Sequence, residues 1–126
     1  MSLKKAFSDN NAYDYAIVKH KQILTLTLKK RGDLTLHISL TSKQMLIETV
    51  ISPVENIRDV NKLNYRLLCL QKILPLSSVG ISVIHHQEYY IAFGALSLSS
   101  SFDDIILEIE TLANNALELA EIISEA

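Results

Sequence analysis

The sequence predicts an α+β fold in which helices pack against an antiparallel sheet. Residues 23–51 and 79–98 alternate apolar and polar side chains with the period of two that strands show. Residues 59–74 and 101–123 carry apolar stripes at helical spacing. The resulting order is helix–strands–helix–hairpin–helix, which lacks the strand–helix–strand alternation of a parallel sheet. A length of 126 residues fits one domain, 1–126.

The N-terminal segment is predicted to hold a short helix and a first strand. Leu3, Ala6 and Phe7 share one face of an amphipathic helix over residues 2–8. The polar residues Asp9-Asn10-Asn11 are then expected to break the helix. The apolar stretch Tyr15–Val18 is expected to be the first strand.

Residues 23–40 give the clearest local signal, a hairpin whose leucines all stand at even positions. Even positions must face even positions if the leucines are to share one side of the sheet. A three-residue loop, Lys30-Arg31-Gly32, meets this condition by pairing Leu28 with Leu34 and Lys29 with Asp33. It also gives Gly32 the left-handed conformation that such loops require. A two-residue turn would set Leu28 opposite Thr35 and mix the faces.

The middle of the chain is predicted to hold another strand and a helix. Residues 45–51 alternate as an antiparallel strand, and Pro53 ends it because proline cannot donate to the ladder. Residues 54–58 form a linker. Asp59 is expected to cap a helix that runs to about Leu74, since Pro75 disfavours a helical residue before it. Its apolar stripe consists of Val60, Leu63, Leu67, Leu70 and Leu74.

The last third predicts a second hairpin and a long helix. The hairpin over residues 79–98 turns at His85-His86-Gln87-Glu88. Ser101 and Asp104 resemble a capping box at the start of the helix, and acids there suit the helix dipole. The predicted apolar stripe is Ile105, Ile109, Leu112, Ala116, Leu119 and Ile123, widened by Ile106, Ala113, Leu117 and Ala120. The side chains expected mainly on the outer side are Glu108, Glu118, Glu121 and Glu125.

Charge is divided unevenly along the chain. Residues 1–63 carry ten Lys or Arg and six Asp or Glu, whereas residues 64–126 carry two and eight, which gives +4 and -6. An acidic helix lying near a basic hairpin would explain the division, and so would self-pairing or a polar partner surface. The net charge of -2 gives no basic footprint for nucleic acid. The partner-surface candidates are Lys29, Lys30, Arg31, Glu108, Glu118 and Glu121.

No motif in the sequence predicts a reaction. Adjacent His85 and His86 would point to opposite faces of a strand, so they favour a solvated turn over a metal site. His37 has no nucleophile or orienting acid at a suggestive spacing, and Cys69 is expected to be a buried small apolar residue. With three glycines, the chain cannot build a glycine-rich nucleotide loop. We therefore expect no catalytic, cofactor or metal residues, and a protein that is not an enzyme.

The sequence also carries no export or membrane signal. No apolar run follows the lysines near the N-terminus, and no stretch approaches the length that spans a bilayer. A single cysteine cannot form an internal disulfide. The expected location is the cytoplasm.

Several stretches closely resemble the YjfI-like family of small bacterial proteins. They are Gln44–Thr49, Leu74–Ser82, Glu88–Leu98, Asp104-Ile105 and Asn115–Ile122, and the likeness covers roughly residues 23–123. The family is a domain of unknown function, so the resemblance implies no catalytic or ligand residues. Its genes tend to lie beside those for proteins similar to phage shock protein A, which coats stressed membranes. The resemblance therefore implies a partner of the phage-shock-protein-A-like type.

The order of elements is also similar to the fold of YbjN and the type III secretion chaperones. That similarity implies a small cytoplasmic protein that binds other proteins and usually dimerises. Four strands are predicted before the middle helix, whereas that fold usually has three.

The sequence leaves two functions open. The first is a non-enzymatic protein-interaction or chaperone-like module linked to membrane stress. The second is a small-ligand-binding or catalytic domain that uses the polar sheet face, with Thr25, Thr27, Lys29 and His37. A homodimer is also expected, because of an exposed strand edge or because the stripe over residues 105–123 exceeds what one small sheet can cover.

Overall fold

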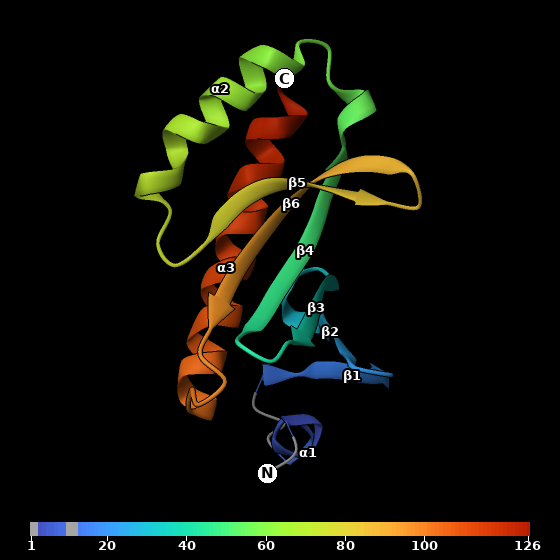
Figure 1. Ribbon diagram of the computed structural model, residues 1–126, viewed down its shortest axis with the longest axis vertical. Helices are drawn as coiled ribbons and strands as arrows, with labels where there is room; N and C mark the ends of the chain where they lie inside the picture. The colour runs from blue at the N-terminus through green and yellow to red at the C-terminus, as the bar shows by residue number, and fades with distance from the viewer. Residues whose placement is uncertain (1–2, 10–12) are drawn as a thin grey trace.

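The computed structural model describes residues 3–9 and 13–126 and confirms the predicted α+β class. Its six strands form one antiparallel sheet in the order β1-β2-β3-β4-β6-β5 (Figure 1). Short 3-10 turns cover Lys29–Arg31, Val54–Asn56 and Gln71–Ile73. The main elements are α1 (Leu3–Ser8), β1 (Tyr15–His20), β2 (Ile23–Leu28), β3 (Leu34–Leu40), β4 (Met45–Pro53), α2 (Val60–Leu70), β5 (Ser78–Ile84), β6 (Gln87–Leu96) and α3 (Phe102–Ser124).

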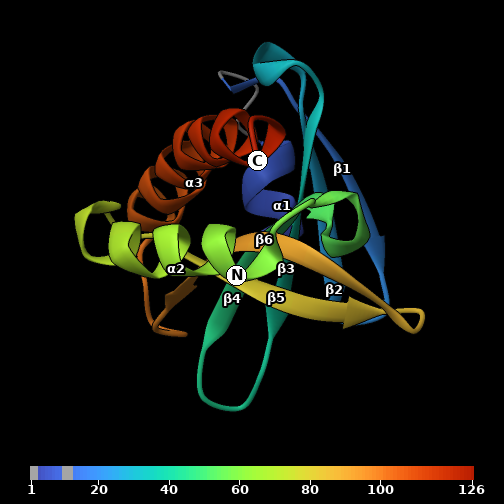
Figure 2. The ribbon, with the colours of Figure 1, turned by 90° about the horizontal axis from the view of Figure 1, so that it is seen from above.

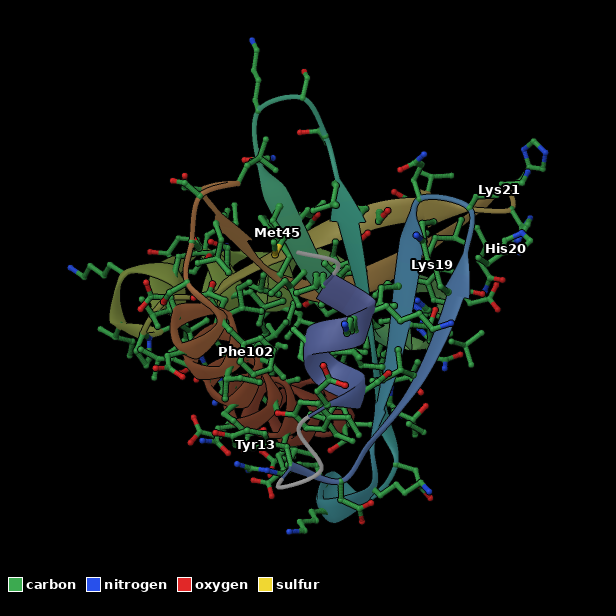
Figure 3. The ribbon with its side chains drawn as sticks, turned by 90° about the horizontal axis from the view of Figure 1, so that it is seen from below. Tyr13, Lys19, His20, Lys21, Met45 and Phe102 are labelled. Atoms are coloured by element: carbon green, nitrogen blue, oxygen red, sulfur yellow. The ribbon has the colours of Figure 1, made fainter. Side chains whose placement is uncertain are left out.

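The helices gather on one side of a strongly curved sheet (Figure 2). Helix α3 runs along the sheet and α2 crosses at one end (Figure 1), while α1 lies between α3 and the β1–β2 hairpin (Figure 3). Phe7 of α1 packs its ring edge-on against Phe102 of α3, with centroids 5.2 Å apart. The aliphatic core lies between these helices and the inward side of the sheet, where Leu26, Leu36 and Ile109 are fully buried.

The first hairpin has the predicted register, and its loop is longer than predicted. Leu28 faces Leu34, as expected from the shared face of the leucines, and Gly32 is left-handed with φ 66°. The connection nevertheless spans residues 29–33, because Lys29–Arg31 wind into a 3-10 turn and Asp33 also takes a positive φ of 60°. The predicted three-residue loop is therefore wrong in length.

The second hairpin turns in two residues, and the predicted four-residue turn at residues 85–88 is wrong. His85 and His86 have φ of 51° and 67°, and the pair Ile84↔Gln87 closes the turn. Two positive φ values are typical of the type I′ turn, whose twist matches that of the strands. Both histidines are exposed in this turn.

The helix ends largely follow the predicted caps. Asp59 accepts a hydrogen bond from the Lys62 amide at 3.1 Å, and Ser101 accepts one from the Asp104 amide at 3.1 Å. Helix α2 ends at Leu70, and a 3-10 turn carries the chain on to Ile73. Strand β1 extends past the predicted residues 15–18 to His20. Within the predicted break at residues 9–11, positions 10 and 11 lie outside the described residues.

Candidate functional site

The basic hairpin tip binds the acidic helix of the same chain. Arg31 Nη2 lies 3.2 Å from Glu110 Oε1, and its Nη1 donates to the side chain of Asn114. The Tyr15 hydroxyl donates to Glu110 Oε2 at 2.7 Å. Burial, together with the neighbouring Glu110 carboxylate, raises the pKa of Tyr15. An acidic helix near a basic hairpin was one explanation of the charge division, and this network confirms it.

Glu108 is buried, so its expected position on the outer side of α3 is wrong. Only 4% of the residue is exposed, and its carboxylate lies directly over Gly94 of β6. Glu108 is three residues after Ile105 and four before Leu112, which places it on the stripe that faces the sheet. Burial raises the pKa of its carboxyl group. Leu117, which was expected to widen the stripe, is 46% exposed on the opposite side.

The six candidate partner-surface residues do not form one site. Arg31 is engaged with α3 and Glu108 is buried, as described above. Lys29 and Lys30 are exposed at the hairpin tip, and Glu118 and Glu121 are exposed on α3. The structure thus brings the tip to the helix through Arg31, and it leaves the remaining charges on separate surfaces.

The other candidates for chemistry are placed without a reactive arrangement. Thr25 Oγ1 lies 3.1 Å from His37 Nδ1 on the side of the sheet opposite the helices (Figure 2), and Glu48 faces His37 in the register. Cys69 is an exposed free thiol, so its predicted burial is wrong. It stands two residues after buried Leu67, which is half a turn round the helix. Among residues 3–9 and 13–126, no three His, Cys, Asp or Glu side chains gather as metal ligands.

An apolar groove between α2 and β5 is the feature that sequence reasoning missed. It encloses a hollow of about 230 Å³ beside Leu68, which is 70% exposed, and Ile81, which is 43% exposed. Beyond the hollow, Tyr65 and Val83 also expose most of their side chains. The lining residues are Asn64, Leu67, Leu68, Gln71, Val79, Gly80, Ile81 and Tyr90. A group of exposed apolar side chains beside a hollow is typical of a binding surface.

The three polar side chains of the groove, Asn64, Gln71 and Tyr90, already make hydrogen bonds within the fold. The Tyr90 hydroxyl donates to Asn64 Oδ1 at 2.5 Å and so fastens α2 to β6. The Gln71 amide bonds to the backbone of Val79 in β5. These bonds hold the two walls of the groove at a fixed separation.

Helix α2 and the turn after it are rich in positive charge. Residues 58–72 carry four basic side chains and one acid, and Lys62, Arg66 and Lys72 are exposed. Lys62 and Arg66 stand half a turn from the groove residues Asn64 and Leu68, so they lie on the far side of the helix, whereas Lys72 follows the groove residue Gln71. The signal in the sequence was the position of Tyr65 and Leu68 outside the stripe through Leu63 and Leu67. Their exposure follows from that position. The hollow itself depends on where β5 lies relative to α2, which the stripe does not reveal.

Comparison with known proteins gives the family. The model of a family described as "Uncharacterized protein conserved in bacteria (DUF2170)" matches residues 1–126. The chain belongs to this family. It is 50% identical over 109 residues to the uncharacterised protein YjfI of Escherichia coli strain K12, and equally to that of strain O157:H7. Each match covers 86% of this chain and 82% of the relative. The expected YjfI-like family is therefore confirmed.

Two solved structures share the fold. The crystal structure of E. coli YbjN matches with a TM-score of 0.67 at 13% identity, over 100% of this chain and 91% of that one. An uncharacterised protein from Methanothermobacter thermautotrophicus matches with a TM-score of 0.65 at 12% identity, over 98% and 95%. The expected YbjN-like fold is confirmed, and at these identities the likeness concerns the fold alone.

Proposed function

We propose that this protein is a non-enzymatic, chaperone-like module that binds another protein through the α2–β5 groove. The supporting observation is the groove itself, an apolar hollow between Leu68 and Ile81 with exposed apolar side chains around it. Burying these side chains under a partner would release the water that now covers them. The groove gives the fold a surface whose chemistry suits a protein segment.

A protein partner suits the groove better than a small ligand. Sites for small molecules combine an apolar wall with a few polar groups that fix the orientation of the ligand. Here the polar groups of Asn64 and Gln71 already bond to Tyr90 and Val79. The alternative site, the polar sheet face with His37 and Thr25, presents a hydroxyl–imidazole pair that bond to each other. The observations therefore favour binding over catalysis.

We infer that the partner is a coat protein of the phage-shock-protein-A-like type, in keeping with the YjfI-like family resemblance. The net positive charge of residues 58–72 would favour the approach of an acidic segment of such a protein. We place the complex in the cytoplasm, where the exposed thiol of Cys69 would remain reduced. Among the helices in residues 3–9 and 13–126, none has the length and apolar character to cross a membrane.

A binding measurement with a matched control tests the proposal. Calorimetry with a purified protein of the phage-shock-protein-A-like type is expected to show binding by the wild-type chain. Leu68→Asp should weaken it by about tenfold or more, because a carboxylate would enter the apolar groove. Leu117→Asp changes a leucine on α3 that is 46% exposed and lies outside the groove, and it should keep full affinity. Absence of binding by the wild type, or equal affinities for all three chains, would count against the proposal.

We also propose that the protein forms a homodimer. One reason for expecting it, an uncovered stripe on α3, does not hold, because Ile109, Leu112 and Leu119 are buried in the core. The other reason is an open strand edge, and the sheet ends in two of them, at β1 and β5. An exposed edge can pair with a second copy.

A further inference from the structure

Strand β5 turns part of its backbone away from the sheet at the groove. The pair Ile84↔Gln87 closes a two-residue turn, so these two residues exchange hydrogen bonds across the hairpin. Bonded and non-bonded pairs then alternate along the strand. Consequently Val79, Ile81 and Val83 point their N–H and C=O groups away from β6.

The side chain of Gln71 already bonds to the first of these positions. Its Nε2 donates to the Val79 carbonyl at 2.5 Å, and its Oε1 accepts from the Val79 amide at 3.2 Å. A primary amide that bonds to both groups of one residue reproduces what the peptide of a neighbouring strand would do. Gln71 therefore occupies the place of the first residue pair of a further strand and leaves the places beside Ile81 and Val83 to a ligand.

We propose that an extended segment of the partner protein adds to the sheet along β5 and continues the ladder that Gln71 begins. The inference rests on the proposed function, since it describes how the groove binds its partner. Added next to β5, a strand would project alternate side chains toward Leu68 and the hollow. Its backbone would bond to Ile81 and Val83, which supplies affinity independent of sequence.

The net charge of residues 58–72 specifies the chemistry of the added segment. This stretch carries four basic side chains and one acid, and its Lys72 follows Gln71, the residue that bonds to Val79. Lys62 and Arg66 lie on the far side of α2 from the groove, so they favour an acidic segment at long range, while Glu88, which faces Val83 in the register, adds one negative charge near the turn. A second copy paired at this edge would bring the same basic stretch near its equivalent. Lipid has no backbone to pair with Ile81 and Val83. We therefore assign the edge to an acidic, extended protein segment.

Designed peptides provide the first test. The probe is a short labelled peptide that alternates Val and Thr between glutamates, and it is compared with the same core between lysines. By fluorescence anisotropy, the acidic peptide is expected to bind about tenfold or more tightly than the basic one. Two further peptides carry N-methyl groups at the odd or at the even positions. One of them should lose binding and the other should bind as before, because only one of the two sets of N–H groups would face β5.

Amide exchange provides a direct readout of the added strand. In the free protein, the amides of Ile81 and Val83 should exchange faster than those of Gly80 and Ser82, and the acidic peptide should slow both. Equal binding of the two N-methylated peptides, or no slowing, would overturn the inference. So would slowing of both amides by anionic phosphatidylserine vesicles without peptide, which would point to a lipid surface.

Two proline variants separate this inference from the proposed function. Val83→Pro removes an N–H that makes no bond to β6, whereas Lys19→Pro removes the equivalent outward N–H on β1 at the other edge. Binding of the phage-shock-protein-A-like protein should fall about tenfold with Val83→Pro and stay unchanged with Lys19→Pro. If Leu68→Asp weakens binding and Val83→Pro does not, the groove binds without strand addition. If neither variant weakens binding, the proposed function fails as well.

Discussion

At the residue scale, Glu108 and Gly94 depend on each other. A Cβ at position 94 would occupy the space of the Glu108 carboxylate oxygen and would lie 3.0 Å from its Cδ. Because Glu108 is almost fully buried, its side chain has little room to move aside. The pair explains why a strand otherwise rich in large residues tolerates a glycine at this point.

We predict that Gly94→Ala lowers the free energy of unfolding by about 1–3 kcal/mol, which is the usual cost of overpacking. Glu108→Ala in the same chain should recover much of this loss, because it removes the side chain with which the new methyl group collides. Urea denaturation of the wild type, the two single variants and the double variant gives the coupling energy. Strictly additive effects would mean that the two residues do not compete for the same space.

The pKa of Glu108 links stability to pH. Burial raises this pKa in the folded protein above the ordinary value of 4.5. Between the ordinary and the raised pKa, the folded state holds more protons than the unfolded state, so the contribution of Glu108 to stability falls as the pH rises through that range. Glu108→Gln removes the titration, and its gain in stability should be largest above the raised pKa and shrink below the ordinary pKa. Denaturation at several pH values checks this, and a gain independent of pH would contradict it.

At the scale of elements, Asn115 fixes helix α3 to the loop before β5. Its Nδ2 donates to the Pro75 carbonyl and to the Ser77 hydroxyl, each at 2.9 Å, and Asn115 and Ser77 are both buried. The loop between them turns sharply, with Leu76 at φ 63°. A buried side chain thus sets the point where strand β5 begins.

We predict that Asn115→Ala destabilises the fold by about 1–3 kcal/mol, because it leaves the buried Ser77 hydroxyl without its donor and removes one of the two donors to the Pro75 carbonyl, which keeps the bond from the Ser77 amide. Asn114→Ala is a suitable comparison: this neighbour is exposed, and its side-chain oxygen accepts a hydrogen bond from the half-buried Arg31. The loss of stability in Asn114→Ala should be much smaller than that in Asn115→Ala, because surface contacts contribute little to stability. Thermal unfolding of the two variants compares them, and equal losses would argue against a special role for Asn115.

The elements that could be predicted are those set by local patterns. The even-numbered leucines fixed the pairing of Leu28 with Leu34, and the hydroxyl of Ser101 marked the start of α3. The loops were predicted less well, since the length of a turn depends on positive φ values such as that of His86. The α2–β5 groove could not be predicted, because it arises between elements whose relative position no local pattern determines.

At the scale of the whole molecule, the divided charge serves two different surfaces. The basic tip of the β2–β3 hairpin meets the acidic helix through Arg31 and Glu110, whose side chains are 30% and 32% exposed. A pair with that exposure contributes modestly to stability. The basic side chains of α2, Lys62 and Arg66, instead stand on the far side of that helix from the apolar groove, and Lys72 follows the groove residue Gln71. The first group of charges therefore belongs to the fold, and the second is available to a partner.

The two open edges of the sheet differ in their suitability for a second copy, and the last prediction concerns β1. By the same alternation that applies to β5, the pair His20↔Ile23 turns the N–H groups of Ile17 and Lys19 outward. Lys19–Lys21 lie at one end of β1 and Tyr13 at the other (Figure 3). Antiparallel pairing of two β1 strands would place each basic end beside the other copy's tyrosine end, so like charges would stay apart.

We therefore predict a homodimer joined at β1, which Lys19→Pro should convert to the 14.1 kDa monomer and Val83→Pro should leave intact. Sedimentation velocity at micromolar concentrations distinguishes the two species. Because the pairing would rest on backbone bonds and on the exposed Val18 and not on ion pairs, raising the salt concentration should have little effect. A wild-type monomer at every concentration would refute the dimer. A dimer that survives Lys19→Pro and separates with Val83→Pro would move the interface to β5, where it would compete with the partner segment.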